Sequence, residues 1–229
     1  MPFTFSIESW EPEPGADISA GPALPAGTVA IGEGVFRGID EIVEMCVPEG
    51  VASIGSRAFS GCMGLRSISL PSTLTSLGEA VFEHCQSLEE IALPKGLRAV
   101  PDGAFQGCNA LRRVVIPDSV VEIGAKAFMN CRALEVIELH DSVSRIGERA
   151  FSGCVELKAA RLPERLELLG ARAFFGCKEL AEVFFPDDVA VLGDRAFGSC
   201  RALNMLEAQE PLRSKLMQQG EWAVAARRC

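Results

Sequence analysis

The sequence has no tyrosine, only two histidines and no long apolar segment, and these shortages narrow its possible functions. Its apolar runs have the length of a strand, so no segment of the sequence is long enough to cross a bilayer. The start, MPFTFSIESWEPEPG, lacks the basic region and long apolar core of a signal peptide, so we expect a cytoplasmic protein. Because the net charge is −9, we expect neither a nucleic acid nor an anionic membrane as partner.

The sequence also lacks the residue groups that catalysis, metal binding and cofactor binding require. A nucleophile–base pair needs a histidine beside a reactive serine or cysteine. His84 adjoins only Cys85, which the repeat described below assigns to the core, and His140 stands where other repeats have proline. There is no C-x-x-C pair and no glycine-rich phosphate loop. We therefore expect a protein that is not an enzyme and that binds no cofactor and no metal.

A repeat of 23 residues occupies most of the chain and decides the fold prediction. Eight copies follow one another without an insertion or deletion, which predicts one elongated solenoid and leaves no insertion that could form a catalytic loop. Each copy has a phenylalanine, and in seven copies a cysteine follows three positions later. The phenylalanines are Phe36, Phe59, Phe82, Phe105, Phe128, Phe151, Phe174 and Phe197, and the cysteines are Cys62, Cys85, Cys108, Cys131, Cys154, Cys177 and Cys200.

Alternating apolar residues in each repeat predict a short, half-buried strand. They stand 9 and 11 positions after the phenylalanine, as Ile68 and Leu70 do after Phe59. A proline usually follows, and because proline cannot donate a hydrogen bond within a sheet, it marks the end of the strand. The residues before each phenylalanine predict a second short extended piece that runs into a brief helical turn. Phenylalanine and cysteine, three positions apart, would share the inward face of that turn.

A glycine precedes the phenylalanine by four positions in seven copies, and Pro101 replaces it in the other. Proline fixes φ near about −65°, so this position does not need a positive φ. We predict that the glycine is required because neighbouring coils approach closely there.

The combined pattern LxxIxLPxxVxxIGxxAFxxCxxL resembles the BspA-like class of leucine-rich repeat and covers roughly four fifths of the chain. The resemblance implies an α/β repeat solenoid, right-handed, with a parallel concave sheet and short helical turns on the convex side. We expect an N-terminal cap and partial repeat over residues 1–28, eight repeats over 29–208 and a C-terminal helical cap over 209–229. Many family members are surface or adhesion proteins, so the resemblance implies the cell surface as the alternative location.

The row of cysteines has three possible explanations. Stacked coils place equivalent Cα atoms about 4.8 Å apart, within the range of roughly 4.4 to 6.8 Å that disulfides span. Parallel side chains do not provide the twist of about 90° that a disulfide needs, however. A metal would need converging ligands, which a linear row does not offer. We therefore predict buried free thiols that fill space in the core, with disulfides in some rungs as the alternative and a metal site as the least favoured explanation.

The predicted binding surface is the outward side of the strands, 8 and 10 positions after each phenylalanine, where the repeats differ. Such variation suits a binding surface, although an unselected surface varies in the same way. Phe184 is the only aromatic residue at these positions, and it predicts an apolar patch with a charged border on the later coils. Phe175 is a second candidate on the opposite face. The predicted partner-binding residues are Val136, Glu138, Arg161, Glu182, Phe184, Met205 and Glu207.

From these observations we predict a non-enzymatic scaffold that mediates protein–protein interaction through its concave face. The alternative is a structural spacer, or a piece of a larger cell-surface or adhesion protein, whose concave face would tolerate substitution.

Overall fold

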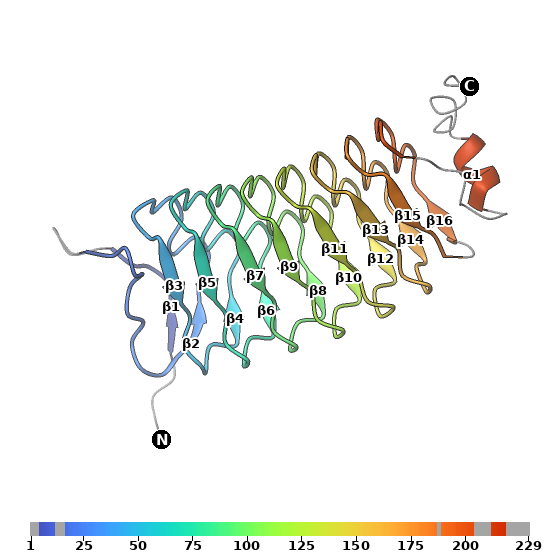
Figure 1. Cartoon of the computed structure of the whole chain (residues 1–229). Helices are drawn as coiled ribbons and strands as arrows, with labels where there is room; N and C mark the ends of the chain where they lie inside the picture. Colours follow the sequence, from blue (N-terminus) through green and yellow to red (C-terminus); the bar gives the residue numbers. More distant parts are fainter. Residues whose placement is uncertain (1–4, 12–16, 187–188, 204–211, 219–229) are drawn as a thin grey trace.

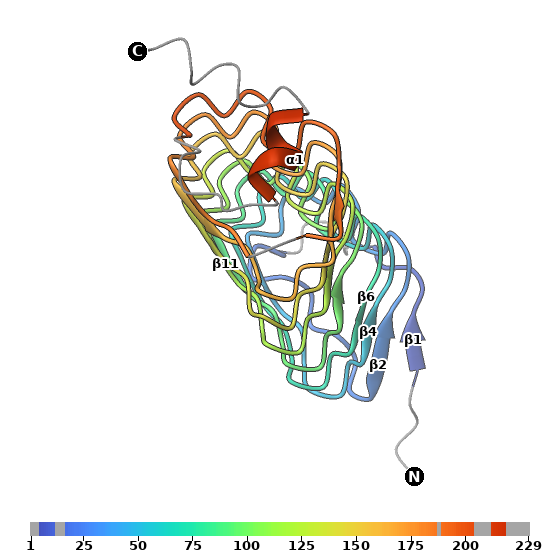
Figure 2. The same cartoon turned by 90° about the vertical axis from the view of Figure 1, so that its right-hand side faces the viewer.

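The structure, a computed structural model, describes residues 5–11, 17–186, 189–203 and 212–218. The chain winds into a stack of coils, one for each 23-residue repeat, which together form an elongated parallel β-solenoid (Figure 1). Figure 2, in which the C-terminal end of the stack faces the viewer, shows coils of similar shape lying one behind another with a progressive displacement. We number the coils 1 to 8 by their phenylalanines, from Phe36 in coil 1 to Phe197 in coil 8. The strands lie on two opposite faces of the solenoid.

The first face, which we call the long-strand face, carries the strands that the alternating residues predict. In each strand the middle side chain is buried and the outer two point outward. Neighbouring strands are parallel and pair residues 23 positions apart, as Ile91 pairs with Val114. The strands are β3 (Glu44–Cys46), β5 (Ser67–Ser69), β7 (Glu90–Ala92), β9 (Arg113–Val115), β11 (Val136–Glu138), β13 (Ala159–Arg161) and β15 (Glu182–Phe184).

The opposite, short-strand face confirms the second extended piece of each repeat. Before coil 1, strand β1 (Phe5–Ile7) pairs in parallel with the first strand of this face, and the ring of Trp10 lies 5.6 Å from that of Phe36. Strand β1 and Trp10 therefore lie against the first coil. The strands are β2 (Thr28–Ile31), β4 (Ser53–Ile54), β6 (Ser76–Leu77), β8 (Ala99–Val100), β10 (Glu122–Ile123), β12 (Arg145–Ile146), β14 (Leu168–Leu169) and β16 (Val191–Leu192).

The predicted helical turns are not confirmed. The segment between the two faces consists of turns whose main-chain N–H groups donate to the next coil, as Arg57 does to the Glu79 oxygen at 2.9 Å. The φ angle is positive two residues before and two residues after each phenylalanine, for example 54° at Arg57 and 77° at Gly61. Left-handed residues and bonds to the next coil prevent an α-helix. In the described ranges the one α-helix is α1 (Leu212–Gln218), within the predicted C-terminal cap.

The core is a stack of aromatic rings flanked by thiols. All eight repeat phenylalanines are buried, and successive ring centroids lie 5.0 to 5.6 Å apart. The repeat cysteines lie beside this stack and are free thiols as predicted. A uniform core of this kind needs one small, weakly polar side chain per coil beside the ring, and cysteine provides it.

The glycine prediction is also confirmed. A Cβ atom on Gly147 would lie 2.5 Å from the Ala125 nitrogen of the preceding coil, closer than real Cβ contacts allow. None of the seven glycines at this position has a positive φ. Close approach between coils, and not a left-handed turn, therefore excludes side chains there.

Each face has one interruption in its sheet, at a different level of the stack. On the short-strand face the break falls between β6 and β8. In other coils the N–H of the repeat glycine, four residues before the phenylalanine, donates to the preceding coil, as Gly124 does to the Val100 oxygen at 2.8 Å. Pro101 has no N–H and cannot make this bond. On the long-strand face the break falls between β9 and β11.

Candidate functional site

The candidate site is a groove on the long-strand face that crosses β9, β11, β13 and β15. It consists of two adjoining hollows, of about 380 Å³ and about 520 Å³, which share Val136, Glu138 and His140. The first hollow spans the break between β9 and β11, and the second continues over β13 to Phe184. We call the whole feature the β9–β15 groove. It lies toward the C-terminal half of the stack (Figure 1).

The strand geometry determines which side chains enter this groove. Each strand has only three residues, with the middle one in the core, so its first and last residues both point outward. Because the strands are in register, those outward residues form two columns along the stack. The groove is therefore built from the positions at which the repeats differ.

Large apolar side chains in the groove are unusually exposed. Val115, Val136 and Phe184 have 46%, 51% and 54% of their surface accessible, although each lies on a strand. Val115 ends β9 and Val136 begins β11, on the two sides of the sheet interruption. The hollow at this interruption therefore has a partly apolar lining, to which the buried Val114 and Ile116 also contribute.

The charged side chains of the groove are only partly paired. Lys158 donates to the Glu135 carboxylate at 3.2 Å, which neutralises both. Arg112, Arg113 and Arg161 are exposed, and none forms an ion pair with another described residue. The groove therefore presents open guanidinium groups on a chain whose net charge is −9.

The structure places four of the predicted residues together in the groove, namely Val136, Glu138, Arg161 and Phe184. Glu182 lies on β15 with its Cα opposite Ala159, outside the lining of the hollows. The predicted residues Met205 and Glu207 fall outside the described residues.

The residues of the groove that were missed include Arg112, Arg113, Val115 and His140. Arg113 and Val115 occupy outward strand positions, so the alternation could have identified them. His140 was visible as the one residue that replaces a strand-ending proline, and it belongs to the coil that follows the sheet interruption. Arg112 precedes β9 and carried no repeat signal.

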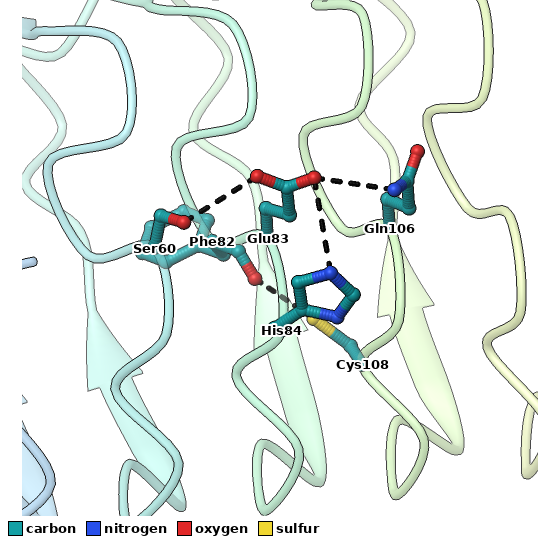
Figure 3. A network of polar contacts seen from close by, with 6 residues as sticks. All are labelled: Ser60, Phe82, Glu83, His84, Gln106 and Cys108. Atoms are coloured by element: carbon teal, nitrogen blue, oxygen red, sulfur yellow. Dashed lines mark hydrogen bonds and ion pairs between the residues drawn. The ribbon is translucent and has the colours of Figure 1, made fainter. Parts of the chain in front are cut away.

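A second group of polar side chains lies on the turns of coils 2 to 4 (Figure 3). Its centre is Glu83, whose carboxylate accepts hydrogen bonds from Ser60 Oγ at 3.4 Å and from Gln106 Nε2 at 3.1 Å. The imidazole Nε2 of His84 lies 3.9 Å from the same carboxylate. These contacts join three consecutive coils, so the network stabilises the stack.

Cys85, the sequence neighbour of His84, is not arranged as a nucleophile. Its thiol is buried and donates to the main-chain oxygen of Phe59 at 3.1 Å. Burial raises the pKa of the Cys85 thiol well above its usual value, so the thiol stays protonated at neutral pH.

Among the residues that the structure describes, no three histidine, cysteine or acidic side chains come together as a metal site. No helix there combines the length and apolar character needed to span a membrane.

Comparisons with known proteins agree with this geometry. The pattern of the BspA type Leucine rich repeat region matches residues 22–135 and 121–216, in six copies. The chain is similar to the T. pallidum Leucine Rich Repeat protein, with 28% identity, coverage of 87% of this chain and 81% of that one, and a TM-score of 0.57.

A second solved structure, a leucine rich cell surface protein from Faecalibacterium prausnitzii, shares 27% identity with a TM-score of 0.51. The match covers 78% of this chain and 62% of that one, so this chain spans less than two thirds of that protein. The search of curated proteins gave no match.

Proposed function

The chain belongs to the BspA-type leucine-rich repeat family, and on that basis we propose that it is a non-enzymatic scaffold that binds a protein partner through the β9–β15 groove. Stacked repeats present extended surfaces that suit protein partners. The fold alone does not specify a ligand, so the support must come from the surface itself.

The observation that carries this proposal is the exposure of Phe184 beside Val136 and Arg161 in one groove. Binding hot spots are rich in aromatic and arginine side chains and are surrounded by weaker contacts that exclude water. An exposed ring at the edge of a hollow can gain several contacts when a partner covers it. Isolated apolar side chains on a surface need no such explanation, but an apolar group that lines a hollow suggests a binding site.

The test is affinity capture with the immobilised full chain, followed by mass spectrometry of the retained proteins. Phe184→Glu and Val136→Glu should each abolish retention of the specific partner, because a hydrated carboxylate would replace the apolar side chain that the partner covers. Val121→Glu is the matched control, since Val121 is also exposed, at 41%, but lies outside the groove. Retention of the same proteins by all variants would contradict the proposal.

We also propose the cell surface as the location, in place of the cytoplasm. The support is the Faecalibacterium prausnitzii protein, whose name describes a leucine rich cell surface protein. A spacer within a larger surface protein is then the alternative function, and it predicts that the groove variants leave every interaction of the chain unchanged. Protease shaving of intact cells, with detection of the released peptides, tests the location.

A further inference from the structure

The open charges of the β9–β15 groove indicate the chemistry of its partner. We propose that the groove binds an extended, acidic peptide segment that carries an apolar side chain between two carboxylates. The inference rests on the proposed function, because it assigns a ligand class to the same surface.

The first argument is charge complementarity. Arg112, Arg113 and Arg161 have no ion-pair partner among the described residues, whereas Glu135 is already paired with Lys158. Two carboxylates of the groove form no ion pair with a described residue, namely Glu138, which lines both hollows, and Asp141, which lines the second. Three open guanidinium groups against two open carboxylates leave an excess of positive charge, opposite in sign to the chain as a whole. Guanidinium groups hold carboxylates through two parallel hydrogen bonds, so an acidic segment is the natural complement.

The second argument is the hollow at the sheet interruption. It measures about 380 Å³ and lies between the exposed side chains of Val115 and Val136, next to the buried Ile116. This volume is at the lower end of the range of ligand pockets, which suits one apolar side chain better than a folded surface. Arg113 of β9 borders this hollow, and Arg161 of β13 borders the adjoining one.

The two arginines are spaced to suit an extended segment. Arg113 begins β9 and Arg161 ends β13, so they lie two strands apart and two residues apart along the strand direction, a Cα separation of roughly 12 Å at the spacings of a β-sheet. An extended chain advances about 3.3 Å per residue. Two carboxylates about four residues apart would therefore reach both arginines, and the apolar residue midway between them would face the same side of the extended chain and enter the hollow.

The experiment is selection of a phage library of random twelve-residue peptides on the immobilised full chain, followed by titration of synthetic peptides by fluorescence anisotropy. We expect selected peptides to carry acidic residues about four positions apart with an apolar residue midway between them. The double variant Arg113→Glu with Arg161→Glu should weaken their binding at least tenfold, and 0.5 M salt should weaken binding to the wild type. The control double variant, Arg98→Glu with Arg165→Glu, changes exposed arginines outside the groove and should bind as the wild type does.

Two results would count against this inference, and they have different meanings. If the selected peptides are neutral or basic, and require Val136 and Phe184 but neither arginine, the groove is a binding site with another ligand class. In that case the acidic-peptide inference is wrong and the proposed function stands. If no selected peptide depends on Val136 or Phe184, both are overturned.

Discussion

The thiol of Cys108 donates a hydrogen bond to the main-chain oxygen of Phe82, 3.1 Å away in the preceding coil (Figure 3). The same oxygen accepts the N–H of Cys85, at 3.1 Å. All seven repeat cysteines bond in this way to the phenylalanine 26 residues earlier, at 2.9 to 3.2 Å. Cysteine therefore fills the core and also supplies a second donor to a buried carbonyl, which alanine could not do.

This arrangement predicts how the thiols react. In the native protein iodoacetamide should label Cys46, which is exposed on β3, long before the buried thiols of coils 2 to 7. Those thiols should all become reactive after denaturation without a reductant, because no disulfide protects them. Peptide mapping by mass spectrometry measures both stages. If denatured, unreduced protein still protects most of its cysteines, the core is disulfide-bonded and this view of it is wrong.

The buried thiols also predict loss of stability in alkali. Burial raises the pKa of Cys62 to about 11 and that of Cys154 to about 12, against about 8.5 for a thiol in an unfolded chain. Above about pH 8.5 the unfolded state releases thiol protons that the native state keeps. Stability is therefore fully present below this pH and is lost as the pH rises toward the native pKa values, by up to about 1.4 kcal/mol per pH unit for each thiol.

Urea denaturation between pH 8 and 10.5 tests this dependence. The variant Cys154→Ala should be less stable at neutral pH, but its free energy of unfolding should fall less steeply with pH, by about 1.4 kcal/mol per unit. Other titrating groups are common to both proteins, so the difference in slope isolates one thiol. Equal slopes would mean that the thiol titrates alike in the native and unfolded states.

The aromatic stack predicts a coupling between Trp10 and Phe36. Phe128→Ala should cost about 3 to 5 kcal/mol, because its ring lies 5.2 and 5.3 Å from those above and below it. A phenylalanine in the first coil would be expected to cost less, but Trp10 gives Phe36 a second aromatic neighbour. We therefore expect a comparable loss for Phe36→Ala, and a coupling with Trp10→Ala of about 0.5 to 1.5 kcal/mol in a double-mutant cycle. Additive losses would show that Trp10 does not pack on the stack.

Substitutions at two glycines distinguish the effect of close approach between coils from the effect of backbone conformation. An added Cβ at Gly147 would meet main-chain atoms of the preceding coil. At Gly176 no atom lies within 4 Å of an added Cβ, but φ is 73°, in the left-handed region that favours glycine. Gly147→Ala should therefore destabilise more than Gly176→Ala, for which strain of about 1 to 2 kcal/mol is partly offset by the lower entropy of the unfolded chain. Thermal unfolding of the two variants gives the order, and the reverse order would contradict this account.

The sequence predicted the features that are common to all repeats better than those that differ between repeats. The 23-residue period was enough to predict stacked phenylalanines, buried cysteines and two extended pieces per coil, because those features follow from identical packing in every repeat. The helical turn was not confirmed, since a spacing of three residues between Phe59 and Cys62 fits a turn with positive φ at Gly61 as well as a helix.

The candidate site was predicted in part for a related reason. Val136, Glu138, Arg161 and Phe184 follow from the alternation of the strands. The hollow beside Val115 could not be predicted, because it depends on a missing pairing between β9 and β11, which is a relation between coils and not a property of one repeat.

The break between β6 and β8 allows a last prediction, because its cause is a single residue. Pro101→Gly would supply an N–H that can donate to the Leu77 oxygen, as the Gly78 N–H donates to the Ile54 oxygen at 2.8 Å. One hydrogen bond contributes about 0.5 to 1.5 kcal/mol, and loss of proline raises the entropy of the unfolded chain by a similar amount, so stability should hardly change. Hydrogen exchange is therefore the better measurement. The new amide at position 101 should exchange as slowly as that of Gly124.

Pro117→Gly is the control for this experiment, since it introduces an amide at the end of a strand, where the main-chain N–H of His140, the equivalent residue of the next coil, donates to no other described main-chain group. That amide should exchange fast. If the amides at positions 101 and 117 exchange equally fast, the break does not arise from the missing proline N–H, and the geometry of coil 4 itself must prevent pairing.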